Sequence, residues 1–364
     1  MNCISDKQLL CEQFITDNHC GVGKYIMGIN PTTRSVLNAL PNIVIDGIID
    51  EFTDAEEYMG IPIVHTIKDI PCNSIVLSVA RINPVSIKRK IIENNLLYID
   101  FFLLIKFFPD LPILKIPFWD GFNESYNNRR NEYDLLYRRF ADNESKNVLH
   151  HLIDFRLNYD VGAMDTFSDQ RDKQYFEPFL NLCANHSFID VGGFDGHTTK
   201  EFIKRCPNYK KVWYFEPEEG NLEKSKAILS NYDRIVFFPF AASDQAGQLH
   251  FEPANDASKV SENGSVVVNS QLIDNYISDD ILNEKLFIKM DIEGGESKAI
   301  TGAKNTILKH HPTMAIAVYH KGTDLIDIPK QVLAIRNDYD LYLRHYTEGT
   351  DETVMFFVPN ASCC

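Results

Sequence analysis

The residues Phe188-Ile-Asp-Val-Gly-Gly-Phe-Asp-Gly-His-Thr-Thr-Lys200 combine a short apolar run, three glycines and a polar segment of helical character. The apolar run predicts a buried strand, and the glycines after it predict a tight turn. Thr198 or Thr199 is a candidate N-cap of the helix that follows. Because backbone N–H groups at a helix start point toward the negative end of a ligand, this stretch predicts a ligand site.

The spacing of the glycines argues against a dinucleotide. A G-x-G-x-x-G pattern that starts at Gly192 requires glycines at positions that hold Phe194 and His197. Asp195 would also repel a pyrophosphate. The observed pattern, Asp190-x-Gly192-Gly193-x-x-Gly196, suits a ligand with a cationic amino group near its aspartate and a compact carboxylate over its glycines. The amino-acid end of S-adenosylmethionine is such a ligand.

Two further apolar runs end in residues that suit an adenosine. Val212-Trp-Tyr-Phe-Glu216-Pro217 predicts a strand that ends in an acidic residue, 20 residues beyond Gly196. A carboxylate at this place can accept hydrogen bonds from both ribose hydroxyls. The next predicted strand, 235–240, is followed by Ala241-Ala-Ser243, which we expect to border the adenine.

These segments, together with Ile288-Lys-Met-Asp-Ile-Glu-Gly-Gly-Glu296 and Val318-Tyr-His320, resemble the FkbM family of S-adenosylmethionine-dependent methyltransferases. The resemblance covers the last half of the chain, and it implies methylation of a hydroxyl, commonly on a sugar or a polyketide. The family pattern often has Asn where this chain has Phe194-Asp195. The predicted cofactor-binding residues are Asp190, Gly192, Gly193, Asp195, Gly196, Glu216, Pro217, Ala241, Ala242, Ser243 and Asp291.

The regular alternation of strands and helices after residue 186 predicts an α/β fold. Five strands are expected at 187–191, 212–216, 235–240, 285–291 and 313–319, followed by a hairpin of 339–345 and 352–358. This is the seven-stranded, Rossmann-like layout of class I methyltransferases. Right-handed crossovers place the ligand loops at the carboxyl ends of the first five strands. An extra strand at 264–268 and a mobile loop at 255–264 are expected between the third and fourth strands.

Three parts of the chain are predicted. Residues 1–120 alternate apolar runs and helical segments, which predicts a smaller α/β domain before the methyltransferase domain. Residues 121–186 predict a helical connector and a cover over the cofactor, and residues 187–364 form the methyltransferase domain. In Gly47-Ile-Ile-Asp50 and Gly60-Ile-Pro-Ile63 the first part resembles the nucleotide-sugar-binding domain of PglD-type sugar acyltransferases, which implies binding of an acceptor or a nucleotide-linked sugar.

A second glycine-rich segment, Gly21-Val-Gly23-Lys24, lies in this first part. It lacks the G-x-x-x-x-G-K-[ST] spacing of a P-loop. Two interpretations remain open, a phosphate-cradling turn and an ordinary strand-to-helix turn.

The catalytic candidates lie at the ends of the fourth and fifth strands. His320 is the preferred general base for an acceptor hydroxyl, because imidazole titrates near neutral pH. Strand alternation is expected to turn Asp291 and Glu293 to the same side, where they orient the acceptor. Two alternatives stay open. His320 can instead fix the loop through a carboxylate, or all three residues can bind Mg²⁺ or Mn²⁺, which lowers the pKa of the acceptor.

Composition bounds the possible functions. A net charge of −15 argues against a nucleic-acid partner, since no basic face is available. The longest apolar run, Leu96–Phe108, is too short to span a bilayer, and no signal-peptide core is visible, which predicts a cytosolic protein. The 8 cysteines form no C-x-x-C pair and so indicate no zinc site. N-methylation and a non-catalytic cofactor-binding interaction module remain alternative functions.

Overall fold

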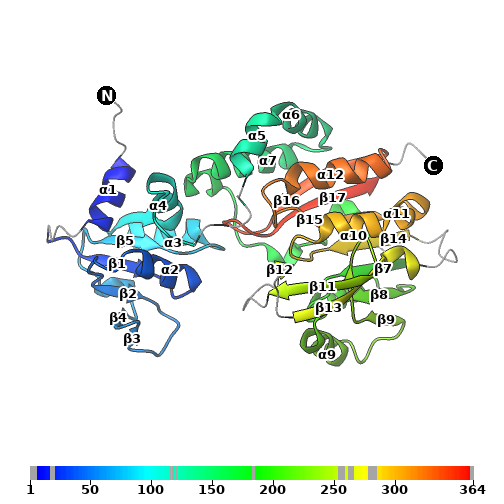
Figure 1. The fold of residues 1–364 in the computed structure, drawn as a ribbon, viewed down its shortest axis with the longest axis horizontal. Coiled ribbons are helices and arrows are strands. Elements are labelled where there is room, and N and C mark those ends of the chain that lie inside the picture. Colours follow the sequence, from blue (N-terminus) through cyan, green and yellow to red (C-terminus); the bar gives the residue numbers. More distant parts are fainter. Residues whose placement is uncertain are drawn as a thin grey trace. The chain divides into compact units, whose positions relative to one another are not determined.

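A computed structural model of the chain describes residues 6–16, 21–114, 116, 119, 121–182, 185–252, 259–260, 266–277 and 285–360. The chain divides into two compact units, each with its own main sheet (Figure 1). Unit 1 comprises Met1–Pro117, His150–Gln170 and Tyr346–Asp351. Unit 2 comprises Phe118–Leu149, Arg171–His345 and Glu352–Cys364.

Unit 1 is built on a six-stranded sheet in the order β3-β4-β2-β1-β5-β6. Its strands are β1 Lys24–Met27, β2 Gly47–Ile49, β3 Glu57–Tyr58, β4 Ile61–Val64, β5 Ile75–Ser78 and β6 Leu97–Asp100. Every neighbouring pair is parallel except β3 and β4. The prediction of an α/β fold with parallel strands is confirmed here.

Successive side chains of these strands point to opposite faces, so each face of the sheet has its own apolar core. Ile26 and Leu77 lie in one core, with side chains of α1, α2 and α4. Met27 and Val76 lie in the other, with Ile91 of α3. The helices are α1 Asp6–Ile15, α2 Pro31–Ala39, α3 Pro84–Glu93 and α4 Phe101–Phe107.

The long apolar run Leu96–Phe108 contains a strand and a helix, because β6 ends at Asp100 and α4 begins at Phe101. The buried Asp100 carboxylate caps the helix by accepting the backbone N–H of Leu103 at 2.9 Å. An acidic residue inside an apolar run therefore marks an element boundary here.

One of the two interpretations of Gly21-Val-Gly23-Lys24, the strand-to-helix turn, is wrong. The segment leads into β1 and follows α1 in the chain, so it is no strand-to-helix turn. Lys24 is buried, and its Nζ donates to the carbonyl of Thr16 at 2.5 Å. A Cβ at Gly23 would lie 2.8 Å from Ser74 Oγ, so close packing inside the unit explains that glycine.

Unit 2 is built on a seven-stranded sheet in the order β16-β17-β15-β14-β7-β8-β9. The strands are β7 His186–Val191, β8 Val212–Phe215, β9 Ile235–Phe238, β14 Lys285–Met290, β15 Thr313–Ala317, β16 Tyr339–His345 and β17 Thr353–Pro359. The first five pair in parallel, and β17 is antiparallel to both β15 and β16. Each of the seven lies where the apolar runs predicted it.

The helices of unit 2 include α8 His197–Arg205, α9 Glu219–Ile228, α10 Glu296–Gly302, α11 Lys304–His310 and α12 Asp324–Ile335. Two more, α5 Phe122–Asn128 and α6 Arg130–Arg139, precede the sheet in sequence. At the centre of the core the Phe188 ring stacks on Phe202 at 4.5 Å and on Phe287 at 5.2 Å. In the described part of the chain no helix combines the length and the apolar character that a membrane span requires.

A second, four-stranded sheet in unit 2 has the order β10-β13-β11-β12. Its strands are β10 Ala241–Ala242, β11 Gly247–Glu252, β12 Lys259–Val260 and β13 Val266–Gln271. The extra strand expected at 264–268 corresponds to β13. The loop expected at 255–264 lies outside the described residues, apart from the two residues of β12.

The two units divide the chain differently from the sequence-based boundaries near residues 120 and 186. Helix α7, Asn143–Asn158, begins in residues of unit 2 and ends in residues of unit 1. The second half joins unit 1 because its apolar side chains pack there, as Phe155 does edge-on against Phe102 of α4 at 5.1 Å. Tyr346–Asp351 also belongs to unit 1, although β16 and β17 on either side of it belong to unit 2.

Candidate active site

The carboxyl ends of four neighbouring strands carry most of the predicted site residues. β15, β14, β7 and β8 lie next to one another and run in parallel. The segments that follow them, near residues 318–320, 291–295, 192–196 and 216–218, therefore emerge at one edge of the sheet.

The loop after β7 requires glycine at two positions. Gly192 has a φ of +76°, and a Cβ there would lie 2.0 Å from the carbonyl oxygen of Asp291. A Cβ at Gly193 would lie 2.1 Å from the ring of Tyr214. Close packing on β14 and β8 thus explains both glycines without reference to a ligand.

Helix α8 begins at His197, after Gly196 in the left-handed conformation with φ +88°. The prediction that Thr198 or Thr199 caps this helix is wrong. Thr199 lies inside the first turn, where its Oγ1 donates to Asp190 Oδ2 at 2.7 Å. Asp195 accepts the backbone N–H of His197 at 3.0 Å, which braces the turn before the helix.

Asp190 is fully buried, and a lysine lies where the sequence predicted the amino group of a ligand. Lys289 Nζ is 3.3 Å from Asp190 Oδ1 and donates to the carbonyl of Gly192 at 2.5 Å. Burial alone would lower the pKa of Lys289, but the charges of Asp190 and Asp291 outweigh it and raise the pKa. Lys289 thus balances the charge of Asp190 inside the chain, a partner that the predicted contact with a cationic ligand did not include.

Glu216, at the carboxyl end of β8, is buried and accepts one backbone N–H on each oxygen. Oε2 accepts from Phe194 at 2.9 Å and Oε1 from Glu218 at 2.9 Å. Burial raises the pKa of Glu216 to about 7, although both N–H groups lower it. Each oxygen keeps a second lone pair, so the carboxylate can still accept two hydroxyls, as the ribose prediction requires. Phe194, whose backbone N–H donates to Glu216, has a left-handed φ of +51° and an exposed side chain.

The segment predicted to border an adenine lies beside the end of β8. The Phe240 ring packs edge-on against Phe215 at 5.6 Å. Ala242 and Ser243 after it are buried, and a Cβ at Gly302 of α10 would lie 2.0 Å from the Ser243 carbonyl oxygen. This close approach of the Ser243 backbone to α10 explains the glycine at position 302.

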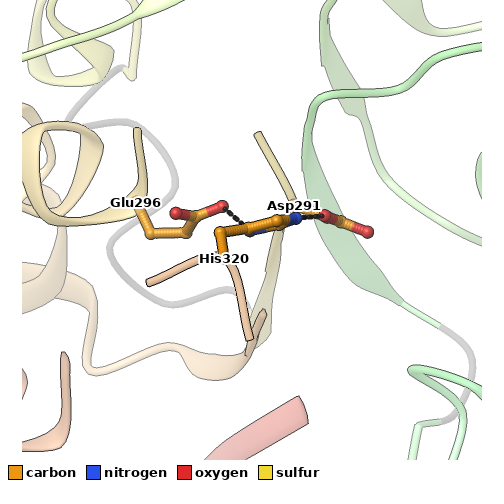
Figure 2. Close-up of side chains that lie close together, drawn as sticks. All are labelled: Asp291, Glu296 and His320. Atoms are coloured by element: carbon orange, nitrogen blue, oxygen red, sulfur yellow. Dashed lines mark hydrogen bonds and ion pairs between the residues drawn. The ribbon is translucent and has the colours of Figure 1, made fainter. Parts of the chain in front are cut away.

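His320 follows β15 and lies between carboxylates (Figure 2). Its Nδ1 is 2.9 Å from Glu296 Oε1, and its Nε2 is 3.4 Å from Asp291 Oδ1 and 3.5 Å from Glu293 Oε2. Burial would lower the pKa of His320, but the charge and hydrogen bond of Glu296 outweigh it and raise the pKa to about 10. His320 lowers the pKa of Glu296 in turn. The structure thus brings together the three predicted catalytic residues.

The reason that Asp291 and Glu293 face His320 differs from the predicted one. β14 ends at Met290, so strand alternation does not apply beyond it. Both residues lie in a turn, in which Glu293 has a left-handed φ of +55°. Glu296, the first residue of α10, was not predicted as a site residue, although its place in the same motif was a usable signal.

Asp291, Glu296 and His320 offer ligand atoms that lie within 4.8 Å of one another, which is compatible with a metal ion. Figure 2, however, shows the two carboxylates at opposite nitrogens of the ring. The Nε2 side, with Asp291 and Glu293, matches the predicted ligand set, and Glu296 would then orient the ring from behind.

Tyr175 lies in the segment 121–186, which was predicted to form a helical connector and a cover over the cofactor. It is buried, and its hydroxyl donates to Asp291 Oδ2 at 2.5 Å. Gln174 Nε2 donates to the same hydroxyl at 2.9 Å and to Glu352 Oε2 at 2.5 Å. The contact joins residues 116 positions apart, so no local pattern predicts it.

An α/β sheet with functional side chains gathered at the carboxyl ends of its parallel strands is typical of enzymes that bind nucleotide-like cofactors. Residues 190–346 match the model of the Methyltransferase FkbM domain. This part of the chain is therefore similar to the FkbM domain family of methyltransferases, and the predicted resemblance is confirmed.

Two curated relatives are methyltransferases by name, and one of the two names includes a sugar acid. The chain is 25% identical over 143 residues to the 2-O-methyltransferase NoeI of Sinorhizobium fredii, a match to 33% of this chain and 58% of that protein. It is 26% identical over 133 residues to the hexuronic acid methyltransferase AglP of Haloferax volcanii, a match to 34% of this chain and 54% of that protein. The chain thus spans little more than half the length of these relatives.

A solved structure resembles nearly the whole chain. The methyltransferase FkbM from Methylobacillus flagellatus superimposes with a TM-score of 0.72, at 23% identity, over 92% of this chain and 90% of its own. This coverage includes residues of both units, so the likeness of fold extends beyond the matched FkbM domain.

Proposed function

We propose that this chain is an S-adenosylmethionine-dependent O-methyltransferase that methylates a hydroxyl of a sugar, a glycan or a nucleotide-linked sugar. The observation that carries the proposal is the buried pair Glu296–His320, in which the Nε2 edge of the ring faces Asp291 and Glu293 beside the glycine loop. The strand order of the seven-stranded sheet supports a class I methyltransferase fold. The names of the curated relatives support the proposal, since NoeI is a 2-O-methyltransferase and AglP methylates a hexuronic acid.

For the cofactor, we propose that Glu216 binds the two ribose hydroxyls through the lone pairs that its backbone contacts leave free. The loop of Gly192, Gly193, Asp195 and Gly196 presents backbone groups to the amino-acid end of the cofactor. Pro217 directly follows Glu216 at the ribose, and Ala241–Ser243 borders the adenine. Asp190 acts indirectly, because it holds Lys289 and Thr199 under this loop. When bound, the cofactor supplies a methyl group activated by a positively charged sulfur.

The chain's own residues must align the acceptor oxygen and remove its proton. We assign proton removal to His320 Nε2, with Glu296 orienting the ring through Nδ1 and Asp291 and Glu293 binding acceptor hydroxyls. A pKa of about 10 leaves His320 protonated near neutral pH in the chain alone. A cationic cofactor nearby lowers the pKa of an imidazole, which favours the neutral form that a base requires.

A second mechanism uses a divalent ion. Mg²⁺ or Mn²⁺ bound by His320 Nε2, Asp291 and Glu293 would lower the pKa of the acceptor hydroxyl directly. The separation of Nε2 from the two carboxylates, 3.4 and 3.5 Å, suits adjacent ligands of one ion. We rank this mechanism second.

We further propose that unit 1 serves the acceptor, either by binding it or by binding a nucleotide-linked sugar. In its sheet β1 and β5 are neighbours, and the chain continues from β1 toward one edge of the sheet and from β5 toward the other. Ligands of open α/β sheets bind at the carboxyl ends of two such strands.

A panel of sugar acceptors incubated with labelled S-adenosylmethionine tests the function. We expect label on a hydroxyl oxygen of at least one sugar. Label on nitrogen would favour the alternative of N-methylation, and cofactor binding without transfer would favour a non-catalytic module. In calorimetric titration, Glu216→Ala should weaken S-adenosylhomocysteine binding by about 1–3 kcal/mol, because two ribose hydroxyls lose their acceptor.

A further inference from the structure

We propose that Tyr175 is a positioning residue for methyl transfer, which acts by fixing Asp291 in the orientation that faces His320. The inference rests on the proposed function, since it assigns a residue to the same site. It holds for either mechanism, because both a base and a metal site need Asp291 in this orientation.

The two oxygens of Asp291 have different partners. Oδ2 accepts the phenolic hydroxyl of Tyr175 at 2.5 Å, while Oδ1 lies 3.4 Å from His320 Nε2. A hydroxyl that donates to a carboxylate forms a short and strong hydrogen bond. Because this bond occupies one oxygen, it holds the carboxylate plane and directs the other oxygen to the imidazole.

Tyr175 is itself fixed from several sides. Its hydroxyl accepts a hydrogen bond from Gln174, which also donates to Glu352 at the start of β17. Lys289 Nζ lies 5.4 Å from the centre of its ring. Its backbone has a left-handed φ of +69°, a conformation that a non-glycine residue keeps only where its surroundings hold it.

The hydrogen bond between Tyr175 and Asp291 continues on both sides into further polar contacts. Gln174, Tyr175, Asp291, His320 and Glu296 therefore form one continuous series of polar contacts through the site.

Tyr175→Phe removes only the hydroxyl and tests the proposal in the full chain. We expect kcat to fall about 10–100-fold, as when a group that orients an active-site side chain is lost, while KM for S-adenosylmethionine stays near wild type. Tyr209→Phe is the matched control, because this buried tyrosine in the same unit donates to the Asp233 carbonyl. The control should keep its kcat. A kcat of Tyr175→Phe equal to that of the control would overturn the proposal.

A second readout is independent of turnover. In chain labelled with ¹⁵N-histidine, the signal of His320 is assigned by its loss in His320→Asn. We expect Tyr175→Phe to shift the His320 signal and Tyr209→Phe to leave it in place. An unshifted signal would overturn the proposal. If the wild-type chain methylates no acceptor, the proposed function fails, while the shifted signal still supports the positioning of Asp291 by Tyr175.

Discussion

Lys289 Nζ lies 3.3 Å from Asp190 Oδ1, and both side chains are buried under the glycine loop. The pair balances two charges that neither residue could carry alone in this environment. Since Lys289 also donates to the carbonyl of Gly192, the pair connects the centre of the sheet to the loop that we assign to the cofactor.

Lys289→Met should leave Asp190 charged and unpaired in the core. We expect a loss of about 3–5 kcal/mol in the free energy of unfolding, measured by urea denaturation. The double variant Lys289→Met/Asp190→Asn removes both charges and should recover a large part of that loss. Equal stability of the single variant and the wild type would contradict the role given to this pair.

Glu216 should make stability depend on pH. Its pKa of about 7 in the folded chain exceeds the ordinary value of 4.5, so between these values the folded state binds a proton that the unfolded state has lost. The free energy of unfolding therefore falls as pH rises from about 4.5 to 7, by about 1–3 kcal/mol. Glu216→Gln has no such proton, so denaturation at pH 5 and pH 8 should show a weaker pH dependence in the variant. The exposed Glu223→Gln is the control and should behave like the wild type.

Chelation separates the two catalytic mechanisms. If His320 is the base, turnover survives EDTA, and His320→Ala loses roughly 10²–10⁴-fold in kcat while S-adenosylhomocysteine affinity stays near wild type. If EDTA abolishes turnover and Mg²⁺ or Mn²⁺ restores it, Asp291 and Glu293 are metal ligands instead.

Glu348 should stabilise unit 1 from a distant part of the sequence. Its carboxylate accepts the backbone N–H of Ser86 at 2.7 Å and the Ser86 hydroxyl at 2.5 Å, in the first turn of α3. Glu348→Ala removes this cap, and we expect a loss of about 1–2 kcal/mol in the free energy of unfolding. Glu223→Ala, at an exposed helix position, should change stability much less.

The main sheet of unit 2 was predictable because apolar runs of strand length alternate with helical segments. The same local patterns located His320, Asp291 and Glu293 at adjacent strand ends. Local patterns cannot name a partner that is distant in sequence, however. The sequence pattern at Asp190, for example, did not indicate its ion pair with Lys289, a lysine within an apolar strand.

The conformation of turns was a second feature that the sequence pattern did not predict. A carboxylate after a strand was expected to follow strand alternation, yet β14 ends before Asp291 and a left-handed turn at Glu293 sets the geometry. Thr199 was a candidate helix cap but lies inside the first turn of α8, where its hydroxyl donates to Asp190. The division into units depended on packing of α7 and of Tyr346–Asp351, which composition does not reveal.

The place of Tyr346–Asp351 in unit 1 has a consequence for biosynthesis. The segment fits against Arg81 so closely that a Cβ at Gly349 would lie 1.6 Å from its carbonyl oxygen, and Glu348 N–H donates to the carbonyl of Ile82 at 3.0 Å. The ribosome makes these residues only after nearly all of unit 2. A nascent chain therefore cannot complete its first unit before starting the second, and α3 stays without its acidic cap until Glu348 has been synthesised.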